Sequence, residues 1–245
     1  MFNRMKILAN ILVQNNEKWM IMFNQMFSKL EHDIDLYVYE NNSTDGTKKY
    51  LFGKKIISEN IDIPNWSRTE RICHFRNKLK KNIESTDYDY VLLIDSNIFF
   101  SKKSLDILIN TLENNSDVAM ACPHAMVKTS LPCEFFYDTF ATVLLDGTRC
   151  GQFTSVIECT SKNPKHDRHC HRVTGASPVF SQTPELKEVK SSFGGFVLLR
   201  YSAFKDSWWS TDAPSDCEHW KFCDDVRKHG KIVINTESKV IWTEF

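Results

Sequence analysis

The sequence predicts an α/β protein with one mostly parallel central sheet and helices on both of its faces. Two observations support this fold class. In the first half of the chain, apolar runs typical of buried strands alternate with segments whose apolar residues recur every three or four positions. A helix between two successive strands lets them pair in parallel and covers one face of the sheet. We expect residues 1–245 to form a single domain.

The expected strands of the first half are short apolar runs. They cover Lys6–Val13, Ile34–Glu40, Lys55–Ser58, Tyr90–Ile94 and Val118–Cys122. The run at 90–94 is apolar throughout, which is typical of a parallel strand that is buried on both faces.

The expected helices lie between these strands. Periodic apolar residues predict helices over 16–30 and 68–83 and a third after Ser104, which we expect to be its N-cap. Turn-forming residues predict a short helix over Thr44–Phe52. The expected buried residues of the 68–83 helix are Ile72, Phe75, Leu79 and Ile83.

The second half begins with an irregular segment. Residues 125–190 are dense in Gly, Pro, Ser, Thr and His and lack periodicity, so we expect loops and short strands there. A strand is expected over 191–204, and the runs 231–235 and 239–242 complete the predicted sheet.

The charge balance argues against two classes of partner. The chain has 31 Lys and Arg and 31 Asp and Glu, so we expect no nucleic-acid surface and no polybasic segment for anionic lipid. The N-terminal apolar run is too short to span a membrane, and no small-residue cleavage site follows it. We therefore expect a soluble, cytoplasmic protein without a transmembrane segment.

The eight cysteines predict reduced thiols, because a chain of this length has ample core-forming residues. A zinc site is one interpretation of "HDRHCHR" (166–172) with Cys150 and Cys159 upstream. These spacings match no closed zinc module, so a loop with a pH-sensitive, hydrogen-bonding role is the preferred interpretation.

Polar residues follow the buried strand at 90–94. Side chains alternate along an extended segment, so Asp95 and Asn97 are expected to point the same way. A carboxylate and an amide oxygen suit Mg²⁺ or Mn²⁺ and leave positions for phosphate oxygens. Without a metal, Asp95 would cap the turn and Asn97 would bond to backbone.

The stretch "LYVYENNSTDGTKKYL" (36–51) ends a strand on a carboxylate and continues into a polar turn. Ligands of such sheets bind beyond the carboxyl ends of the strands, so Glu40 is expected to meet a nucleobase or ribose. The alternative is turn chemistry, with Ser43 or Thr44 as a helix cap. No Gly-x-Gly-x-x-Gly and no Walker-type Lys is present, which argues against dinucleotide and P-loop binding.

Two helices carry further candidates. Arg68, Arg71 and Arg76 crowd the 68–83 helix, either as a solvated face or as bidentate donors to a diphosphate.

A helix is also expected over 215–230, capped by Ser215 or Asp216 and stopped by Gly230. Asp216, Glu218 and His219 near its start suit helix capping, or a general base beside an acceptor hydroxyl.

Taken in chain order, these motifs resemble those of GT-A fold glycosyltransferases. "YVYENNSTDGT" resembles their acidic turn, "DSN" stands at the place of their Asp-x-Asp metal motif, "FGGF" resembles the strand beside the donor sugar, and "CEHWKFCDDVRKHG" resembles the helix near the acceptor. The chain is similar to glycosyltransferase family 2-like enzymes. Through "RICHFRNKL" and "FYDTFATVLLDG" it is more similar to the fungal capsule-associated α-1,3-mannosyltransferases. Asn97 replaces the second acid of the metal motif, and His219 replaces the usual Asp.

The resemblance implies a metal-dependent hexosyltransferase. Its donor would be GDP-mannose or a UDP-sugar bound by residues 1–124, and its acceptor a glycan or glycoprotein bound by 125–245. The implied ligands of Mn²⁺ or Mg²⁺ are Asp95 and Asn97. The implied donor contacts are Glu40, Asn41, Arg68, Arg76, Asp95, Ser96, Gly194 and Gly195.

The resemblance also implies an acceptor-side carboxylate, either Glu218 or Asp216, which would act as a base if the enzyme inverts. Asp138 and Asp146 would contact acceptor or sugar, or serve packing and turns.

Other functions remain open at this point. Asn97 and His219 favour a catalytically weak glycan- or nucleotide-binding module on the same fold. The Cys/His segment would be the centre of a zinc-stabilised interaction protein. A nucleotidyltransferase would carry a glycine- and basic-rich phosphate loop near the first strand, and "ILVQNNEKW" contains none.

Overall fold

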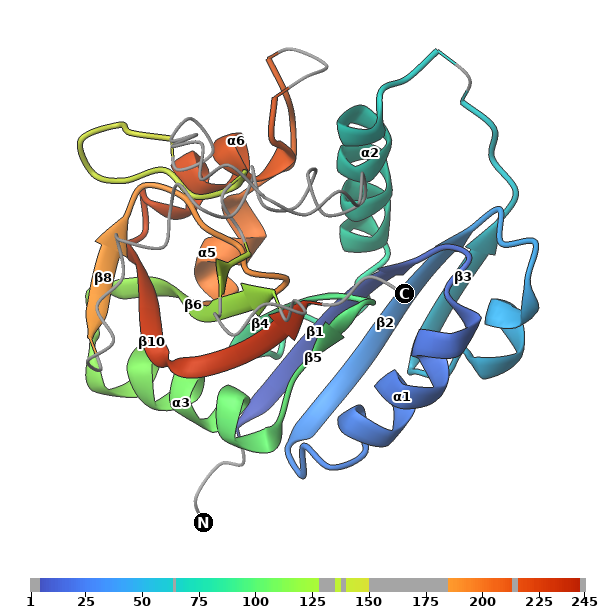
Figure 1. The fold of residues 1–245 in the computed structure, drawn as a ribbon, viewed down its shortest axis with the longest axis horizontal. Helices are drawn as coiled ribbons and strands as arrows, with labels where there is room; N and C mark the ends of the chain where they lie inside the picture. Colours follow the sequence, from blue (N-terminus) through green and yellow to red (C-terminus); the bar gives the residue numbers. More distant parts are fainter. Residues whose placement is uncertain are drawn as a thin grey trace, which may run out of the picture.

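The computed structural model describes residues 5–63, 65–127, 135–137, 140–149, 185–212 and 216–242. Within these residues, one ten-stranded sheet forms the centre of the molecule (Figure 1). The strands are β1 (Lys6–Val13), β2 (Asp33–Asn41), β3 (Lys55–Glu59), β4 (Tyr90–Asp95), β5 (Ile98–Phe99), β6 (Val118–Val127), β7 (Phe135–Phe136), β8 (Leu186–Val189), β9 (Phe196–Arg200) and β10 (Lys231–Trp242). The helices are α1 (Glu17–Phe27), the 3₁₀ helix η1 (Gly46–Tyr50), α2 (Arg68–Lys81), α3 (Lys102–Asn114), α5 (Tyr201–Asp206) and α6 (Glu218–Val226).

The strand order is β3-β2-β1-β4-β9-β6-β10-β5, with β7 beside β6 and β8 beside β10. Strands β3, β2, β1 and β4 are parallel to their neighbours in this order, as expected from the helices that connect them. β9 runs antiparallel to both β4 and β6, and β5, β7 and β8 are antiparallel as well. The prediction of a mostly parallel sheet is therefore correct for β3, β2, β1 and β4 and for the pair β6 and β10, and the complete sheet is mixed.

Two hydrophobic cores lie on opposite faces of the sheet. On one face, α1 and α3 contribute residues such as Phe23, Leu105 and Leu108. On the other face, α2, α5 and α6 contribute residues such as Leu79 and Phe222. Figure 1 shows α1 and α3 below the sheet and α2, α5 and α6 above it. This arrangement confirms the predicted cover of helices on both faces.

Some predicted details are wrong. Ser101, and not Ser104, is the N-cap of α3: its Oγ accepts from the Ser104 N–H at 3.1 Å, while the Ser104 hydroxyl donates to the Lys239 carbonyl. The helix starting at Glu218 has Cys217 as N-cap without a side-chain cap bond, and it ends at Val226, before Gly230. Ser215 lies outside the described residues.

The strand predicted over 191–204 is shorter than expected. Gly194 and Gly195 have φ values of +65° and +70°, which interrupt an extended strand. β9 therefore begins at Phe196, and the chain turns into α5 at Tyr201.

The buried face of α2 also differs from the prediction. Leu79 is buried as expected, but Ile72, Phe75 and Ile83 are only partly buried. The buried positions of α2 are Thr69, Cys73, Arg76, Leu79 and Lys80. The buried face of α2 thus includes the basic side chains of Arg76 and Lys80. The helix pattern alone does not reveal the partners of these two side chains.

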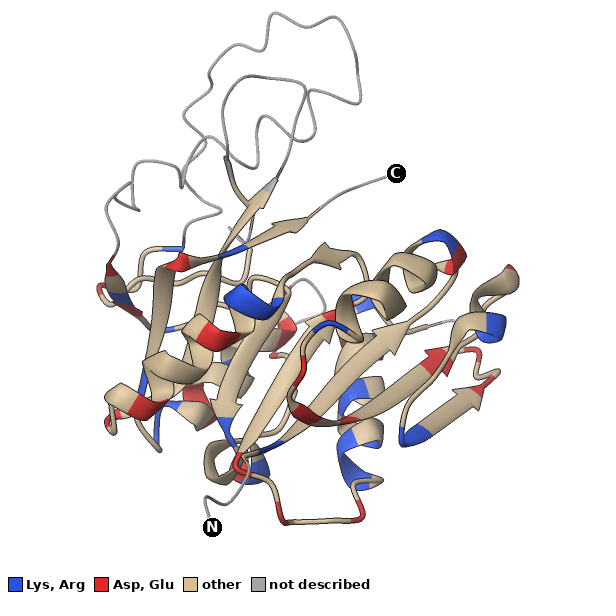
Figure 2. Cartoon of the chain, turned by 90° about the horizontal axis from the view of Figure 1, so that it is seen from below, with Lys and Arg blue, Asp and Glu red and all other residues tan. Residues whose placement is uncertain are grey.

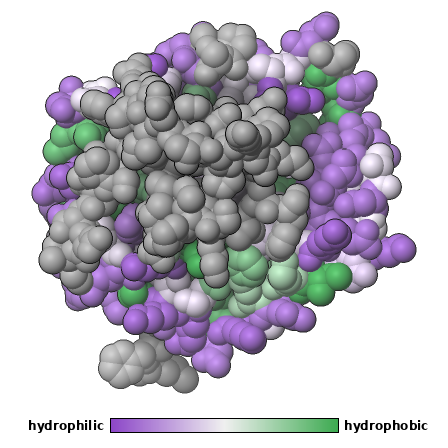
Figure 3. Space-filling view, viewed as in Figure 1, coloured by the Kyte–Doolittle hydropathy of each residue, from purple (hydrophilic) through white to green (hydrophobic). Residues whose placement is uncertain are grey.

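The surface agrees with the balanced composition. Lys and Arg and also Asp and Glu are spread over the helices and strand ends in Figure 2, and α2 is mainly basic. The described surface visible in Figure 3 is largely hydrophilic, with small hydrophobic areas. Among the described helices, none has the length and apolar character needed to cross a membrane. The described cysteines Cys73, Cys122, Cys217 and Cys223 are buried thiols, as predicted.

Candidate active site

A cleft of about 890 Å³ opens at the carboxyl ends of β1, β2 and β4. The strand register explains why these ends meet: Val13 of β1 pairs with Glu40 of β2, and Leu12 pairs with Asp95 of β4. Helix α2 and the first residue of α6 contribute the other wall. The polar and charged residues that line the cleft include Asn15, Asn16, Glu17, Lys18, Asn41, Asn42, Asp45, Asp62, Arg68, Arg71, Arg76, Asp95, Ser96, Asn97 and Glu218.

Asp95 is held at the centre of this cleft. Its backbone N–H donates to the Gly195 carbonyl at 2.8 Å, and its Oδ1 accepts from Arg76 Nη2 at 3.0 Å. The Asp95 side chain is 31% exposed, whereas the Arg76 side chain is only 6% exposed. Both residues line the cleft, and the carboxylate is the more exposed partner of the pair.

Ser96 and Asn97 line the cleft beside Asp95. The Ser96 hydroxyl accepts from Asn16 Nδ2, which joins the β4 turn to the loop after β1. Among the described residues, no group of three His, Cys, Asp or Glu side chains forms a closed metal site. The metal-ligand role of Asp95 and Asn97 stays a prediction.

Glu218 lies at the first position of α6 and also lines the cleft. Burial raises the pKa of its carboxyl group and Asp95 adds to this, against an opposing effect of Arg76 and Arg68. A carboxylate with a raised pKa is a stronger base at neutral pH than an exposed Glu.

His219 is buried directly behind Glu218. Its imidazole stacks on the Phe193 ring with centroids 3.9 Å apart, and its Nε2 lies 3.5 Å from Glu218 Oε1. Burial lowers the pKa of His219 well below the usual value, and Arg76 and Arg68 lower it further. The lowered pKa favours the neutral form of His219 beside the Glu218 carboxyl group.

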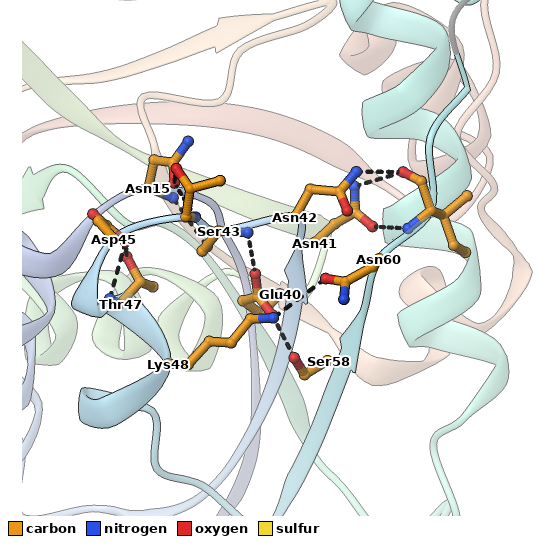
Figure 4. A network of polar contacts seen from close by, with 12 residues as sticks. Asn15, Glu40, Asn41, Asn42, Ser43, Asp45, Thr47, Lys48, Ser58 and Asn60 are labelled. Atoms are coloured by element: carbon orange, nitrogen blue, oxygen red, sulfur yellow. Dashed lines mark hydrogen bonds and ion pairs between the residues drawn. The ribbon is translucent and has the colours of Figure 1, made fainter.

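Glu40 lies beneath the turn that follows β2, outside the residues that line the cleft (Figure 4). It is completely buried and accepts hydrogen bonds from the Ser43 N–H at 2.7 Å and from the Ser58 hydroxyl. Lys48 Nζ lies 3.5 Å from its Oε2. Burial alone would raise the pKa of Glu40, but these hydrogen bonds hold the pKa below its usual value. In this structure the carboxylate organises the turn.

Asn41 follows Glu40 and points to the opposite side of β2, into the cleft. Its amide exchanges two hydrogen bonds with the backbone of Ile61, at 3.1 and 3.0 Å (Figure 4). Asn42 Nδ2 donates to the same carbonyl at 2.7 Å. The two asparagines thus attach the segment after β3 to the end of β2.

Asn15 is a site residue that the sequence interpretation missed. It has a φ of +47°, its Oδ1 accepts from the Thr44 N–H at 2.8 Å, and its N–H donates to Ser43 Oγ. The available signal was the pair Asn15-Asn16 directly after a strand, because Asn tolerates positive φ better than most residues. Tyr137 and Trp242 are further unpredicted lining residues, with rings stacked at 4.7 Å.

Several predicted site residues lie elsewhere. Gly194 and Gly195 do not line the cleft; they turn the chain into β9 behind Asp95. Asp216 is not a lining residue either. Asp146 accepts from the Thr148 N–H at 2.8 Å in a turn, which is one of its two expected roles. Asp138 and the Cys/His segment 150–172 lie outside the described residues.

No protein-family model and no curated protein matches the sequence. Solved structures do match. They include S. aureus TarS 1–349 (15% identity, TM-score 0.57, covering 98% of this chain and 60% of that one). A second is the mannosyltransferase PcManGT from Pyrobaculum calidifontis in complex with GDP-Man and Mn²⁺ (10%, 0.53, 98% and 57%). A third is glucosyl-3-phosphoglycerate synthase from Mycobacterium tuberculosis in complex with Mn²⁺, UDP and phosphoglyceric acid (11%, 0.51, 99% and 72%).

The chain has the GT-A fold. The predicted fold class is thereby confirmed. The chain spans about 60% of the length of the first two matched structures. The similarity to fungal capsule-associated mannosyltransferases stays a prediction.

Proposed function

We propose that the protein is a glycosyltransferase that moves a sugar from a nucleotide-sugar donor to an acceptor hydroxyl with the help of a divalent cation. One observation carries this proposal. A carboxylate and an amide suited to a cation, Asp95 and Asn97, share a cleft with the arginines of α2 and with the buried carboxylate of Glu218. The GT-A fold and the complexes of the matched structures support the same reaction class.

The residues divide into three groups by their chemistry. Asp95 and Asn97 would hold the cation, which supplies positive charge to the diphosphate as the glycosidic bond breaks. The exposed Arg68 and Arg71 at the start of α2 would donate to diphosphate oxygens. Glu218 would accept the proton of the acceptor hydroxyl if the reaction inverts the sugar, or orient the acceptor if it retains.

The donor and acceptor are proposed more broadly. The donor is GDP-mannose or a UDP-sugar, with GDP-mannose favoured by the resemblance to the fungal mannosyltransferases. Asn41, Asn42 and Asn15 would line the nucleoside end, and Glu40 would support them by holding the turn. The acceptor is a glycan or glycoprotein, which suits the stacked aromatic rings of Tyr137 and Trp242 on the cleft wall.

A thermal-shift panel tests this proposal. Ligands that bind only the folded state stabilise it, by about 2.7 kcal/mol at a hundredfold excess over Kd. We expect GDP-mannose or a UDP-sugar to raise the Tm with Mn²⁺ present, and Asp95→Ala to abolish both this shift and sugar transfer. Asp117→Ala is the matched control, because this exposed Asp lies before the amino end of β6 and does not line the cleft. No shift with any nucleotide sugar would contradict the proposal.

A catalytically weak binding module is the second candidate. It is favoured by the neutral Asn97 and by the ion pair that already occupies Asp95 Oδ1. This candidate would be supported if, with Mn²⁺ present, the protein bound nucleotide sugars but neither transferred nor hydrolysed the sugar of any donor tested.

A further inference from the structure

We propose that Arg76 acts as a resident cation that competes with the divalent metal for Asp95, so that the metal binds strongly only together with a nucleoside diphosphate. This inference rests on the proposed function, because it concerns the same cleft. It assigns Arg76 a positioning and gating role that differs from the diphosphate contact expected from the sequence.

The first step is that Arg76 is fixed in place. Its guanidinium carbon lies 4.9 Å from the centre of the Phe193 ring and 5.6 Å from that of Trp209. Only 6% of the side chain is exposed, so this packing holds the guanidinium at the wall of the cleft beside Asp95. Arg remains charged at all physiological pH values, so a full positive charge stays next to Asp95.

The second step is the charge balance at Asp95. In the ligand-free cleft, one carboxylate and one guanidinium form a neutral, hydrogen-bonded pair at 3.0 Å. Asn97 adds a neutral oxygen where a second carboxylate would add negative charge. A divalent cation on Asp95 therefore meets a buried positive charge that shares the same carboxylate, and repulsion between these charges weakens its binding.

The third step is that a diphosphate reverses this penalty. Its negative charges would attract both the cation and the arginines of α2. Metal and nucleotide thus strengthen the binding of each other by the same factor, as linkage requires. Coupling between two ligands typically amounts to about fivefold to 150-fold in affinity, and we expect at least tenfold here.

The test is direct Mn²⁺ binding, measured by the electron paramagnetic resonance signal of the free ion, with and without UDP or GDP. For wild type we expect weak binding of Mn²⁺ alone and at least tenfold tighter binding with nucleotide. Arg76→Met removes the charge at similar volume, so Mn²⁺ alone should bind about tenfold to a hundredfold more tightly and the coupling should shrink. Lys81→Met removes an exposed positive charge at the end of α2 outside the residues that line the cleft, so it is the matched control and should leave binding of Mn²⁺ alone unchanged.

The outcomes separate the two proposals. The role of Arg76 would be overturned, while the proposed function stands, by either of two results. One is equal Mn²⁺ affinity of the wild type with and without nucleotide. The other is a folded Arg76→Met variant that binds Mn²⁺ alone no more tightly than the wild type. Failure of wild type to bind any nucleotide at saturating Mn²⁺ would overturn the proposed function itself. Circular dichroism checks folding, and Arg76→Gln, which keeps an amide toward Asp95, takes the place of an unfolded Met variant.

Discussion

Replacing Gly195 with Ala should destabilise the protein and displace Asp95. Gly195 has a φ of +70°, a conformation that costs a residue with a Cβ about 1–2 kcal/mol. The added Cβ would lie 2.5 and 2.7 Å from Ile98 Cγ1 and Cδ1 and 3.3 Å from Asp95 Oδ2. Ile98 is completely buried and cannot move aside cheaply, so overpacking adds about 1–3 kcal/mol. The expected loss in the free energy of unfolding is therefore about 2–5 kcal/mol.

Urea denaturation of Gly195→Ala and Gly147→Ala measures this effect. Gly147 also has a positive φ, +92°, but its added Cβ would meet only the flexible Lys190 Nζ at 3.5 Å. The control should therefore lose only the backbone part, about 1–2 kcal/mol. Gly195→Ala should also weaken nucleotide binding with Mn²⁺, because the Gly195 carbonyl holds the Asp95 N–H. Equal losses in the two variants would refute the packing argument.

Three further predictions concern buried polar groups. Lys80 Nζ donates to the carbonyls of Phe204, Lys205 and Ser207, so Lys80→Met should cost about 2–4 kcal/mol in denaturation experiments and leave nucleotide binding unchanged. The pKa of His219 is lower in the folded than in the unfolded state. The free energy of unfolding should therefore be unaffected by this histidine above about pH 6.5 and should decrease below that pH, by up to about 1.4 kcal/mol per pH unit. His219→Phe should stack on Phe193 and lack this slope; identical pH profiles of wild type and variant would exclude the assignment. The lowered pKa of Glu40 gives stability that is present above about pH 4.5 and lost below it, and Glu40→Gln should remove this dependence and weaken nucleotide binding in calorimetry.

The position of Asp95 follows from the sequence, whereas the orientation of Glu40 does not. A continuous apolar run identifies β4, and the first polar residue after such a strand lies at the edge where ligands bind. β2 is buried on both faces from Leu36 to Asn41, so no alternation of polar residues shows which side chain enters the cleft. Only the structure shows that Asn41 points into the cleft and that Glu40 points to the other side of β2.

The burial of Arg76 also escapes sequence analysis. On a helix pattern alone, an Arg is expected to face solvent, and the 68–83 segment contains enough apolar residues to suggest another buried face. The aromatic rings that enclose the guanidinium belong to Phe193 and Trp209, more than a hundred residues later. Long-range contacts of this kind decide which face of a helix is buried, and local periodicity does not encode them.

The place of β9 in the sheet has a consequence for synthesis on the ribosome. β9 fills the gap between β4 and β6, although residues 196–200 emerge long after both neighbours. Until then, β4 and β6 each present an unpaired hydrophobic edge that can pair with another nascent chain. The Asp95 N–H also has no Gly195 carbonyl to bind until residue 195 has been synthesised, so the cleft cannot form completely from the first half of the chain.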